Sequence, residues 1–424
     1  MKNVLVFPCG SEIGLEINRA LAFSIHFRLY GGSSVDDHGK FVYKNYIAGI
    51  PFIDSPDFID EINKIIDIYH IDFIVPAHDK VVLKMAENQD VIKATIVTSC
   101  AETCKICSSK RKTYSTFDKL IPTPGVYSLA ERMDFPVFLK PDVGQGTEGT
   151  YKVNTKEEVD FYVRKDPTLL ILEYLPGKEY TVDCFTNNNG KLLFAEGRER
   201  SRIYNGISVN SKQIHHPDFR KLAETINQTL SFQGAWFFQV KGRATGELVL
   251  LEIAPRIAGT MELFRTLGVN FILLSLFDRM GVEVNIFMNN LEVEIDRALF
   301  ARFSINENYE CVYIDLDDTI LINNEVNTDV IKFLYQARNM RKKIILLSKH
   351  KKDIIKTLSE FAISDSLFDD IILLKESETK SKFITNKKAI FIDDSFAERK
   401  EVFDILKIPV FGLDAIQSLL AWKV

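Results

Sequence analysis

The chain has 424 residues, of which 46% are apolar and 26% charged, so it is long enough for two or three globular domains. Its 53 basic and 58 acidic side chains give a net charge of −5, which excludes the strongly basic surface of a nucleic-acid-binding protein. No apolar run has the length of a membrane span, and six cysteines in so long a chain are not a disulfide framework. We therefore expect a cytoplasmic protein with no nucleic-acid or membrane partner.

Residues 1–108 alternate strand-like and helix-like patterns. Asn3–Phe7 (NVLVF) and Asp72–Val75 (DFIV) read as buried strands, whereas Ile13–Phe23 and Phe58–Tyr69 have the spacing of amphipathic helices. This alternation predicts a doubly wound α/β unit.

From about Lys110 to Phe303, strand-like runs are more frequent and are separated by turn sequences such as PTPG and NNNG. This pattern predicts an α+β region with antiparallel sheets. Asn306–Glu310 is polar and without periodicity, so we place a linker there, and the α/β alternation restarts at Cys311. The expected domains are residues 1–108, 109–305 and 311–424.

The first candidate site is a glycine-rich loop within Val137–Tyr151, which reads VFLKPDVGQGTEGTY. A strand ends at Lys140, and Gly144, Gly146 and Gly149 follow. Glycines let backbone N–H groups face an anion, and the lysine adds a positive charge, so the segment suits the phosphates of a nucleotide. Taken alone, the segment is equally compatible with a mobile hairpin turn.

Two further motifs follow in order: Leu172–Asp183 reads LEYLPGKEYTVD, and Phe238–Arg256 reads FQVKGRATGELVLLEIAPR. Together with the glycine loop they resemble the ATP-grasp superfamily, in particular its carbamoyl-phosphate synthetase and biotin carboxylase type. The resemblance spans most of residues 1–300, because the first α/β unit looks like the pre-ATP-grasp domain of that family. It implies a two-lobed fold with ATP bound between the lobes.

The resemblance also implies a role for each matching residue. Lys140 would hold the α- and β-phosphates, the glycine loop would close over the β- and γ-phosphates, and Glu179 would bind the ribose. The lysine or arginine expected upstream falls within Lys110–Lys112, where the register is loose and we favour Lys112. The nucleotide-binding residues implied are Lys112, Lys140, Gly144, Gly146, Thr147, Gly149, Glu173, Tyr174, Leu175 and Glu179.

By the same resemblance, Gln239 and Glu252 would hold Mg²⁺, with Mn²⁺ as a substitute, and Arg256 would meet the charge that develops on an acyl phosphate. The family usually has asparagine as a metal ligand where this chain has Ala254. This difference puts the arrangement with two metal ions in doubt.

The chemistry implied is ligation through an acyl phosphate: a small-molecule carboxylate attacks ATP, and an amine or a related nucleophile captures the product. Arg198, Arg200 and Arg202 are candidates to anchor an anionic substrate, although a solvated charged strand explains each equally well. Two alternatives stay open. One is a kinase that stops at the phosphorylated carboxylate, and the other is a nucleotide-binding protein without catalysis. Homo-oligomerisation also stays open.

The second candidate site lies in Cys311–Ile320, which reads CVYIDLDDTI. A buried strand delivers Asp315 and Asp317 to its carboxyl end, where open α/β sheets bind ligands. The first carboxylate can attack phosphorus, and the second can act as general acid and then base. Downstream, one strand ends at Ser348 and another is followed by Asp393 and Asp394, with a lysine-rich segment between them.

This order resembles the haloacid dehalogenase (HAD) superfamily over residues 311–424. It implies a Rossmann-like domain with a minimal cap that acts on a phosphorylated metabolite. Asp315 would be the nucleophile and Asp317 the acid and base, Ser348 would bind the phosphoryl group, and Lys380, or Lys382, would neutralise charge. The metal ligands implied are Asp315, Asp317, Asp393 and Asp394. A degenerate domain kept for assembly is the alternative.

Two other patterns are given structural interpretations. Cys100, Cys104 and Cys107 have the spacing of an iron–sulfur motif, but no surrounding barrel repeat accompanies them, so we expect reduced thiols. The basic runs Arg341–Lys343 and Lys349–Lys352 are interpreted as solvated helix ends.

Overall fold

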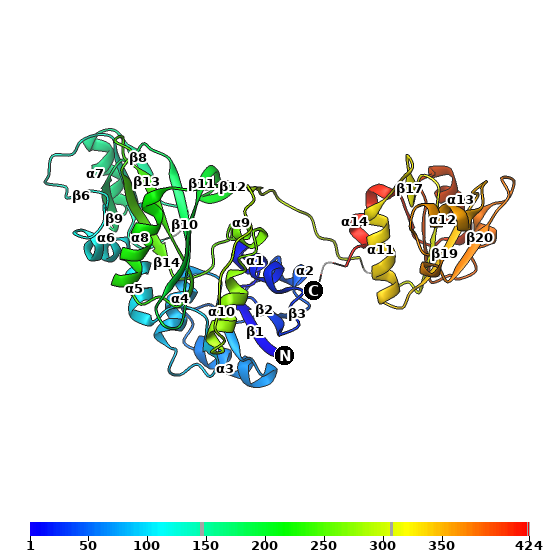
Figure 1. The fold of residues 1–424 in the computed structure, drawn as a ribbon, viewed down its shortest axis with the longest axis horizontal. Helices are drawn as coiled ribbons and strands as arrows, with labels where there is room; N and C mark the ends of the chain where they lie inside the picture. Colours follow the sequence, from blue (N-terminus) through cyan, green and yellow to red (C-terminus); the bar gives the residue numbers. More distant parts are fainter. Residues whose placement is uncertain (145–147, 306–307, 422, 424) are drawn as a thin grey trace. The chain divides into compact units, whose positions relative to one another are not determined.

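The computed structural model describes residues 1–144, 148–305, 308–421 and 423. The chain forms two compact units, Met1–Leu299 and Phe300–Lys423 (Figure 1). Among the described residues, no helix combines the length and the apolar character needed to cross a membrane.

The first unit begins with a parallel five-stranded sheet of order β3-β2-β1-β4-β5. Val4, Leu5 and Val6 in its central strand are all buried, because helices cover both faces. Ser11 caps the first helix by accepting a hydrogen bond from the backbone N–H of Gly14. The elements are β1 Lys2–Phe7, α1 Glu12–Leu21, β2 Phe27–Gly32, α2 Gly39–Val42, β3 Asn45–Ile47, α3 Phe58–Tyr69, β4 Phe73–Pro76, α4 Asp79–Glu87 and β5 Thr95–Ile96.

A small antiparallel sheet of order β6-β9-β7-β8 follows. Its helix α7 begins with a capping box, in which the Thr155 and Glu158 side chains each bond to the other residue's backbone N–H. The elements are α5 Ala101–Ser108, α6 Lys110–Phe117, β6 Val126–Tyr127, β7 Val137–Pro141, β8 Tyr151–Val153, α7 Lys156–Lys165 and β9 Leu169–Glu173.

The third part of the first unit is an antiparallel six-stranded sheet of order β14-β13-β10-β11-β12-β15. Its elements are β10 Glu179–Thr186, β11 Leu192–Tyr204, β12 Ile207–Ile214, α8 Pro217–Thr229, β13 Gly234–Gly242, β14 Leu248–Ala254, α9 Glu262–Thr266, α10 Phe271–Arg279 and β15 Glu294–Asp296.

The predicted division of the first unit at residue 108 does not correspond to a break in packing. Helices α9 and α10 follow the six-stranded sheet in sequence but pack against α1 of the parallel sheet. One apolar core therefore contains Val4 and Leu21 together with Phe237, Phe264 and Leu276. The two expected domains are one compact unit because this shared core removes their apolar faces from water.

The second unit is a parallel sheet of order β20-β19-β16-β21-β22. Alternate residues of its central strand enter different cores: Val312 and Ile314 pack with Phe333 on one side, and Tyr313 packs with Phe391 on the other. The elements are β16 Cys311–Ile314, β17 Leu321–Ile322, β18 Glu325–Val326, α11 Thr328–Asn339, β19 Lys343–Ser348, α12 Ile354–Glu360, β20 Asp370–Leu373, β21 Ala389–Ile392, α13 Phe396–Leu406, β22 Val410–Phe411 and α14 Ile416–Leu419, with short 3₁₀ turns at Asp365–Leu367, Lys380–Lys382 and Leu413–Ala415.

Candidate active sites

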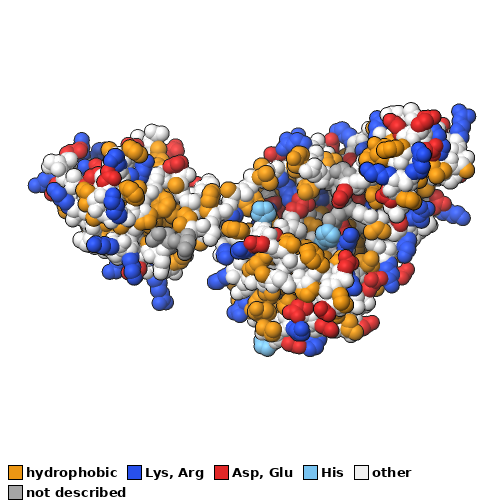
Figure 2. All heavy atoms as spheres, turned by 180° about the vertical axis from the view of Figure 1, so that it is seen from behind, with side chains coloured by type: hydrophobic (Ala, Val, Ile, Leu, Met, Phe, Trp, Pro, Cys, Tyr) orange, Lys and Arg blue, Asp and Glu red, His pale blue; other side chains and the backbone are white. Residues whose placement is uncertain are grey.

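A cavity in the first unit lies between the four-stranded and the six-stranded sheet, and strands of both sheets supply its walls. Seven residues predicted from the sequence line it: Lys140, Glu173, Tyr174, Leu175, Glu179, Gln239 and Glu252. On the face shown in Figure 2, acidic and basic side chains are interspersed over this unit.

The pairing of the strands determines where the charged side chains lie in the cavity. Gln239 of β13 and Glu252 of β14 are register partners, so their side chains lie side by side on the cavity face. Lys140 of β7 belongs to the opposite wall. Burial lowers the pKa of Lys140 to about 8, against the opposing influence of Glu252. An anionic ligand next to this buried lysine would stabilise the charged form of its side chain.

The two predicted glutamates are held by neighbouring cations. Glu179 lies 3.2 Å from Arg200 Nε and 3.6 Å from Lys241 Nζ. Glu173 accepts hydrogen bonds from Arg243 Nε at 2.8 Å and from the Gly125 backbone N–H at 3.1 Å. The carboxylate of Glu173 is thus bound to Arg243, although the residue itself lines the cavity.

Arg256 is not among the residues that line the cavity, and its contact with the reacting phosphate stays a prediction. Its guanidinium makes a two-point ion pair with Asp79 at the start of α4, with Nη2 2.8 Å from Oδ2, and Nη1 donates to the Ile257 carbonyl at 3.0 Å. Burial alone would raise the pKa of Asp79, but the positive charge of Arg256 lowers it. A partner of opposite charge at the start of α4 thus holds the guanidinium in place.

The cation beside the glycine loop is Lys110 rather than Lys112. Lys112 is exposed on α6, whereas Lys110 is buried and its Nζ donates to the carbonyls of Asp142 at 3.3 Å and Gly144 at 3.0 Å. Two residues along a helix point in different directions, so only one of the two can face the loop. At the end of the loop, Gly149 has a φ of 69°, which favours glycine. The predicted contacts Gly146 and Thr147 lie outside the described residues.

The three candidate arginines of β11 have different environments. Arg198 is buried in a two-point ion pair with Asp183, at 2.8 and 3.2 Å, and exposed Arg202 pairs with Asp296. Arg200 alone among the three lines the cavity. Its side chain is 7% exposed, and its Nε has no hydrogen-bond partner among the described residues. Arg200 is therefore the arginine of this strand that can receive a ligand.

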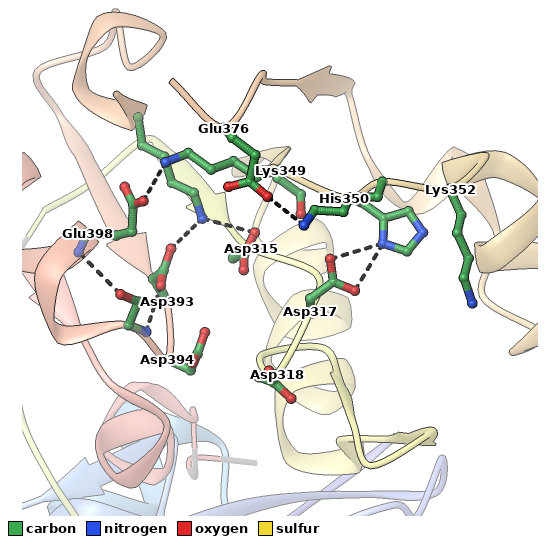
Figure 3. A pocket seen from close by; sticks show the side chains of 14 residues that line it. Asp315, Asp317, Asp318, Lys349, His350, Lys352, Glu376, Asp393, Asp394 and Glu398 are labelled. Carbon is green, nitrogen blue, oxygen red and sulfur yellow. Dashed lines mark hydrogen bonds and ion pairs between the residues drawn. The ribbon is translucent and has the colours of Figure 1, made fainter. Parts of the chain in front are cut away.

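A second pocket lies in the second unit at the carboxyl ends of β16, β19 and β21 (Figure 3). Neighbouring parallel strands end at the same edge of a sheet, which brings together residues far apart in sequence. The predicted residues that line this pocket are Asp315, Asp317, Ser348, Lys380, Asp393 and Asp394.

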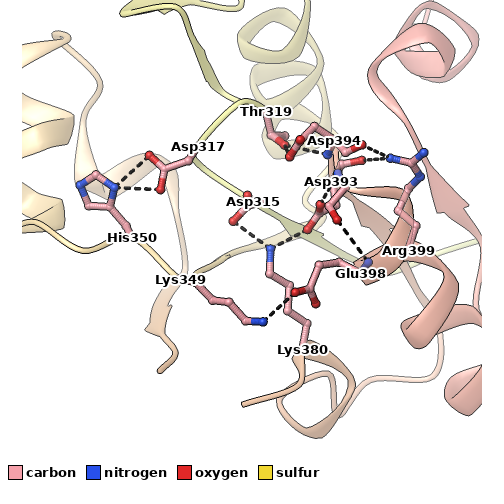
Figure 4. Close-up of polar contacts among 11 residues, drawn as sticks. Asp315, Asp317, Thr319, Lys349, His350, Lys380, Asp393, Asp394, Glu398 and Arg399 are labelled. Carbon is pink, nitrogen blue, oxygen red and sulfur yellow. Dashed lines mark hydrogen bonds and ion pairs between the residues drawn. The ribbon is translucent and has the colours of Figure 1, made fainter. Parts of the chain in front are cut away.

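Lys380 is the buried cation of this pocket (Figure 4). Its Nζ lies 2.9 Å from Asp315 Oδ1 and 2.5 Å from Asp393 Oδ2. Burial would lower the pKa of Lys380, but the two carboxylates raise it. Burial raises the pKa of Asp393 to about 6, although Lys380 opposes this change. The alternative Lys382 is exposed and does not line the pocket.

Asp315, Asp393 and Asp394 each offer an oxygen within 4.8 Å of the others, a spacing that fits one divalent cation. Carboxylate oxygens are the ligands that Mg²⁺ prefers. The buried hydroxyl of Ser348 lies beside the Asp315 carboxylate and lines the pocket, so it too can contact a ligand. Asp317, predicted as a fourth metal ligand, does not bring its side chain into this group.

The side chain of Asp317 is held by a residue that the sequence reasoning missed. His350 Nδ1 lies 3.0 and 2.9 Å from the two Asp317 oxygens. The run Lys349–Lys352 is not a helix end, because it follows β19 directly and lines the pocket. In the other basic run, Arg341 and Lys342 follow the end of α11 as predicted, and Lys343 begins β19. The position of Lys349–Lys352 after a predicted strand was the signal available, since that edge of a parallel sheet is where ligands bind.

Comparisons with known proteins address the first unit. Residues 165–295 match a family described as ATP-grasp in the biosynthetic pathway with Ter operon. The carbamoyl phosphate synthase large chain of Clostridium beijerinckii is 27% identical over 159 residues, which are 32% of this chain and 15% of that protein. The corresponding protein of Thermoanaerobacter sp. is 24% identical over 168 residues, which are 36% of this chain and 16% of the relative. The match thus spans about a sixth of the relatives' length.

Solved structures show the same fold. The biotin carboxylase domain of Hydrogenobacter thermophilus 2-oxoglutarate carboxylase, in complex with MgADP, ADP and bicarbonate, has a TM-score of 0.56 at 16% identity, covering 68% of this chain and 71% of that chain. An ADP complex of N5-carboxyaminoimidazole ribonucleotide synthetase has a TM-score of 0.57 at 15% identity. The superposition covers 80% of this chain and 84% of that chain. An L-amino acid ligase from Bacillus licheniformis has a TM-score of 0.53 at 16% identity, covering 65% and 73%.

These ADP and magnesium complexes agree with ATP and Mg²⁺ as the predicted cofactors. Residues 165–295 therefore match an ATP-grasp family model, and the first unit has the fold of the biotin carboxylase domain and of the N5-carboxyaminoimidazole ribonucleotide synthetase.

Proposed function

We propose that the first unit is an ATP-dependent ligase, which activates a small-molecule carboxylate as an acyl phosphate and transfers the acyl group to an amine. The observation that carries this proposal is a cavity lined by Lys140 on one wall and by Gln239 and Glu252 on the other. A cation facing a carboxylate and an amide across one cavity is the arrangement that a magnesium–nucleotide complex requires.

In this proposal each wall has its own task. Lys140 neutralises phosphate charge, and the segment Glu173–Leu175, which lines the cavity, receives the adenine. Gln239 and Glu252 hold Mg²⁺, or Mn²⁺ in its place, which supplies charge neutralisation at the transferred phosphoryl group. Arg200 anchors the anionic substrate, which is supported by its place in the cavity. The amine then attacks the acyl phosphate carbon and releases phosphate.

The positions of Ala254 and Arg256 change how the site works. Alternation along β14 places Ala254 on the same face as Glu252, where its methyl group offers no ligand atom. A cation at this place would therefore be held by Gln239 and Glu252 without a ligand from residue 254. Arg256 contributes through its ion pair with Asp79, which joins the end of β14 to the parallel sheet.

A coupled ADP-release screen of paired carboxylates and amines tests the ligase proposal. The wild type should release ADP with one pair, and Lys140→Ala should lower the rate by about 100-fold or more, as expected when a charge partner of the transition state is removed. Lys191→Ala is the matched control, because Lys191 is exposed outside the cavity. Equal rates for Lys140→Ala and the wild type would refute the assignment.

The same screen separates the two alternatives. A kinase would release ADP with the carboxylate alone and would accumulate the acyl phosphate. A nucleotide-binding protein without catalysis would bind MgATP and release no ADP with any pair. The ligase releases inorganic phosphate only when the amine is present.

We also propose that the second unit is a HAD-like phosphohydrolase acting on a phosphorylated metabolite. The specific observation that favours it is Lys380 bridging Asp315 and Asp393 beside the buried hydroxyl of Ser348. The Asp315 carboxylate attacks phosphorus, and the leaving oxygen takes a proton from Asp317. Water then gives a proton back to Asp317 and attacks the aspartyl phosphate, so that phosphate leaves and Asp315 is restored.

Asp315→Asn tests this second proposal, because an amide cannot form the aspartyl phosphate. The wild type with Mg²⁺ should hydrolyse p-nitrophenyl phosphate and form an acid-stable phosphorylated protein during turnover, and the variant should do neither. Asp329→Asn is the control, since Asp329 lies in α11 and does not line the pocket. Full hydrolysis by Asp315→Asn would exclude Asp315 as the nucleophile.

A further inference from the structure

His350 is placed to control the side chain of Asp317. It follows β19 at the rim of the second pocket, and its side chain is 9% exposed, whereas that of Asp317 is 52% exposed. The Nδ1 atom contacts both carboxylate oxygens at 2.9 and 3.0 Å. The Nε2 atom lies 2.9 Å from the hydroxyl of Thr357 on α12, which is itself buried.

The imidazole is fixed at both ends. When Asp317 is ionised, Nδ1 carries the proton and donates to the carboxylate; when Asp317 carries the proton for the leaving group, its O–H can donate to Nδ1. The Thr357 hydroxyl can donate to Nε2 or accept from it, so it satisfies that nitrogen whether or not it carries a proton. The ring therefore keeps its orientation through α12, and the rigid ring determines where the flexible aspartate lies.

The direction of Asp317 follows from this contact. Figure 4 shows its carboxylate turned toward His350 and away from the cluster of Asp315, Lys380 and Asp393. Asp315 and Asp317 are only two residues apart, but Asp315 contacts Lys380 and Asp317 contacts His350. Without the histidine, the exposed Asp317 side chain would be free to rotate among its rotamers or to approach a cation bound by the acidic cluster.

We propose that His350 is a positioning residue that holds Asp317 at the pocket rim as the proton donor for the leaving group, with Thr357 orienting the imidazole. This inference rests on the proposed phosphohydrolase function. It makes a chemical distinction between substrates: an alkyl phosphate needs a proton delivered to its poor leaving group, and an activated aryl phosphate does not. His350 is therefore important for alkyl phosphates in particular.

The test compares kcat for glycerol 2-phosphate and p-nitrophenyl phosphate at saturating Mg²⁺. His350→Ala should lower kcat for the alkyl ester by about 10- to 100-fold, the lower part of the range for general acid catalysis, and kcat for the aryl ester by much less. KM should change little, because His350 acts on Asp317 and not on the phosphoryl group. Asp317→Asn should show the same selective loss, and the double variant should lose no more than either single variant.

Two conservative variants distinguish positioning from packing. His350→Asn keeps an N–H group near the Nδ1 position and should retain most of the alkyl phosphatase activity. His350→Gln places its amide near the Nε2 position, where it reaches Thr357 but not Asp317, and should behave like His350→Ala. Thr357→Val keeps the packing of α12 and should cause a smaller loss with the same preference for the aryl ester.

Two outcomes would overturn the inference. One is an unchanged ratio of alkyl to aryl hydrolysis in His350→Ala, and the other is equal activity of the Asn and Gln variants. Failure of the proposed function looks different, because the wild type would then hydrolyse neither ester in the presence of Mg²⁺, and the inference would fall with it.

Discussion

The cavity of the first unit and the pocket of the second unit gather charge in opposite ways. The cavity is built from antiparallel strands of two sheets, and its carboxylate Glu179 has two cationic neighbours, Arg200 and Lys241. The pocket is built at the carboxyl ends of adjacent parallel strands, where Lys380 alone bridges Asp315 and Asp393. Cations thus outnumber carboxylates around Glu179, and carboxylates outnumber cations around Lys380.

Because of this difference, the two sites are expected to bind ligands of opposite charge. The cavity holds Lys140 with its pKa lowered by burial, so an anion stabilises it. The pocket holds Asp393 with its pKa raised by burial, so a cation stabilises it. The comparison predicts that a nucleotide stabilises the first unit and a divalent metal ion the second.

The largest effect that we expect is on the hydrolysis rate of the second unit when its metal ion is removed. Chelation with EDTA should lower hydrolysis of p-nitrophenyl phosphate by more than about 100-fold, because the three carboxylates then repel the phosphate. Added Mg²⁺ should restore the rate. Undiminished hydrolysis in EDTA would show that the cluster of Asp315, Asp393 and Asp394 needs no cation.

Removing the buried lysine should have the next largest effect. Lys380→Met leaves two buried carboxylates without their counter-charge and should lower the free energy of unfolding of the second unit by about 3–5 kcal/mol at neutral pH. The loss should shrink as the pH falls, because protonation of Asp393, whose pKa is already raised to about 6, relieves the repulsion. Urea titrations in EDTA at several pH values measure the loss of unfolding free energy and its dependence on pH.

Lys382→Met is the matched control for Lys380→Met, because Lys382 lies in the same 3₁₀ turn and is exposed. It should change the free energy of unfolding by less than about 0.5 kcal/mol. Equal losses from the two variants would contradict the special role of Lys380.

The ion pair between Arg256 and Asp79 should have a smaller effect. Asp79→Ala leaves a mostly buried guanidinium unpaired and should lower the free energy of unfolding of the first unit by about 3 kcal/mol. A double-mutant cycle with Arg256→Ala should give a coupling energy of about 1–3 kcal/mol. The exposed pair of Lys40 and Asp36 is the control and should couple by less than about 1 kcal/mol. A coupling energy of zero between Arg256 and Asp79 would show that their ion pair does not stabilise the first unit.

The smallest effect concerns the protonation of Lys140. Its pKa of about 8 in the free protein should rise when phosphates bind, so binding takes up a proton above pH 8. The affinity for MgADP should therefore fall as the pH rises beyond 8, by up to about tenfold per pH unit. Calorimetric titrations from pH 7 to 9.5 should show this slope in the wild type and a weaker one in Lys140→Met. Identical slopes would exclude Lys140 as the titrating group.

Much of the fold was predictable because the signals that define its elements are local. The amphipathic spacing of Phe58–Tyr69 matches the bounds of α3, and the apolar run before Ser348 matches the end of β19. The strands that carry Lys140 and Ser348, and the strand that precedes Asp315, also follow from such runs.

The contacts that correct the prediction are not local. Arg256 meets Asp79 from 177 residues away, and His350 meets Asp317 from 33 residues away. Hydrophobic periodicity carries no information on such pairs. The choice between Lys110 and Lys112 failed for a different reason, since both lie on α6 and only its packing decides which side chain faces the loop.

A crystal structure of the chain with MgADP tests the central claim most directly. The account predicts one ADP between the two sheets of the first unit, with its phosphates next to Lys140 and a magnesium ion next to Gln239 and Glu252. Nucleotide bound elsewhere at full occupancy, with that cavity containing only water, would contradict it.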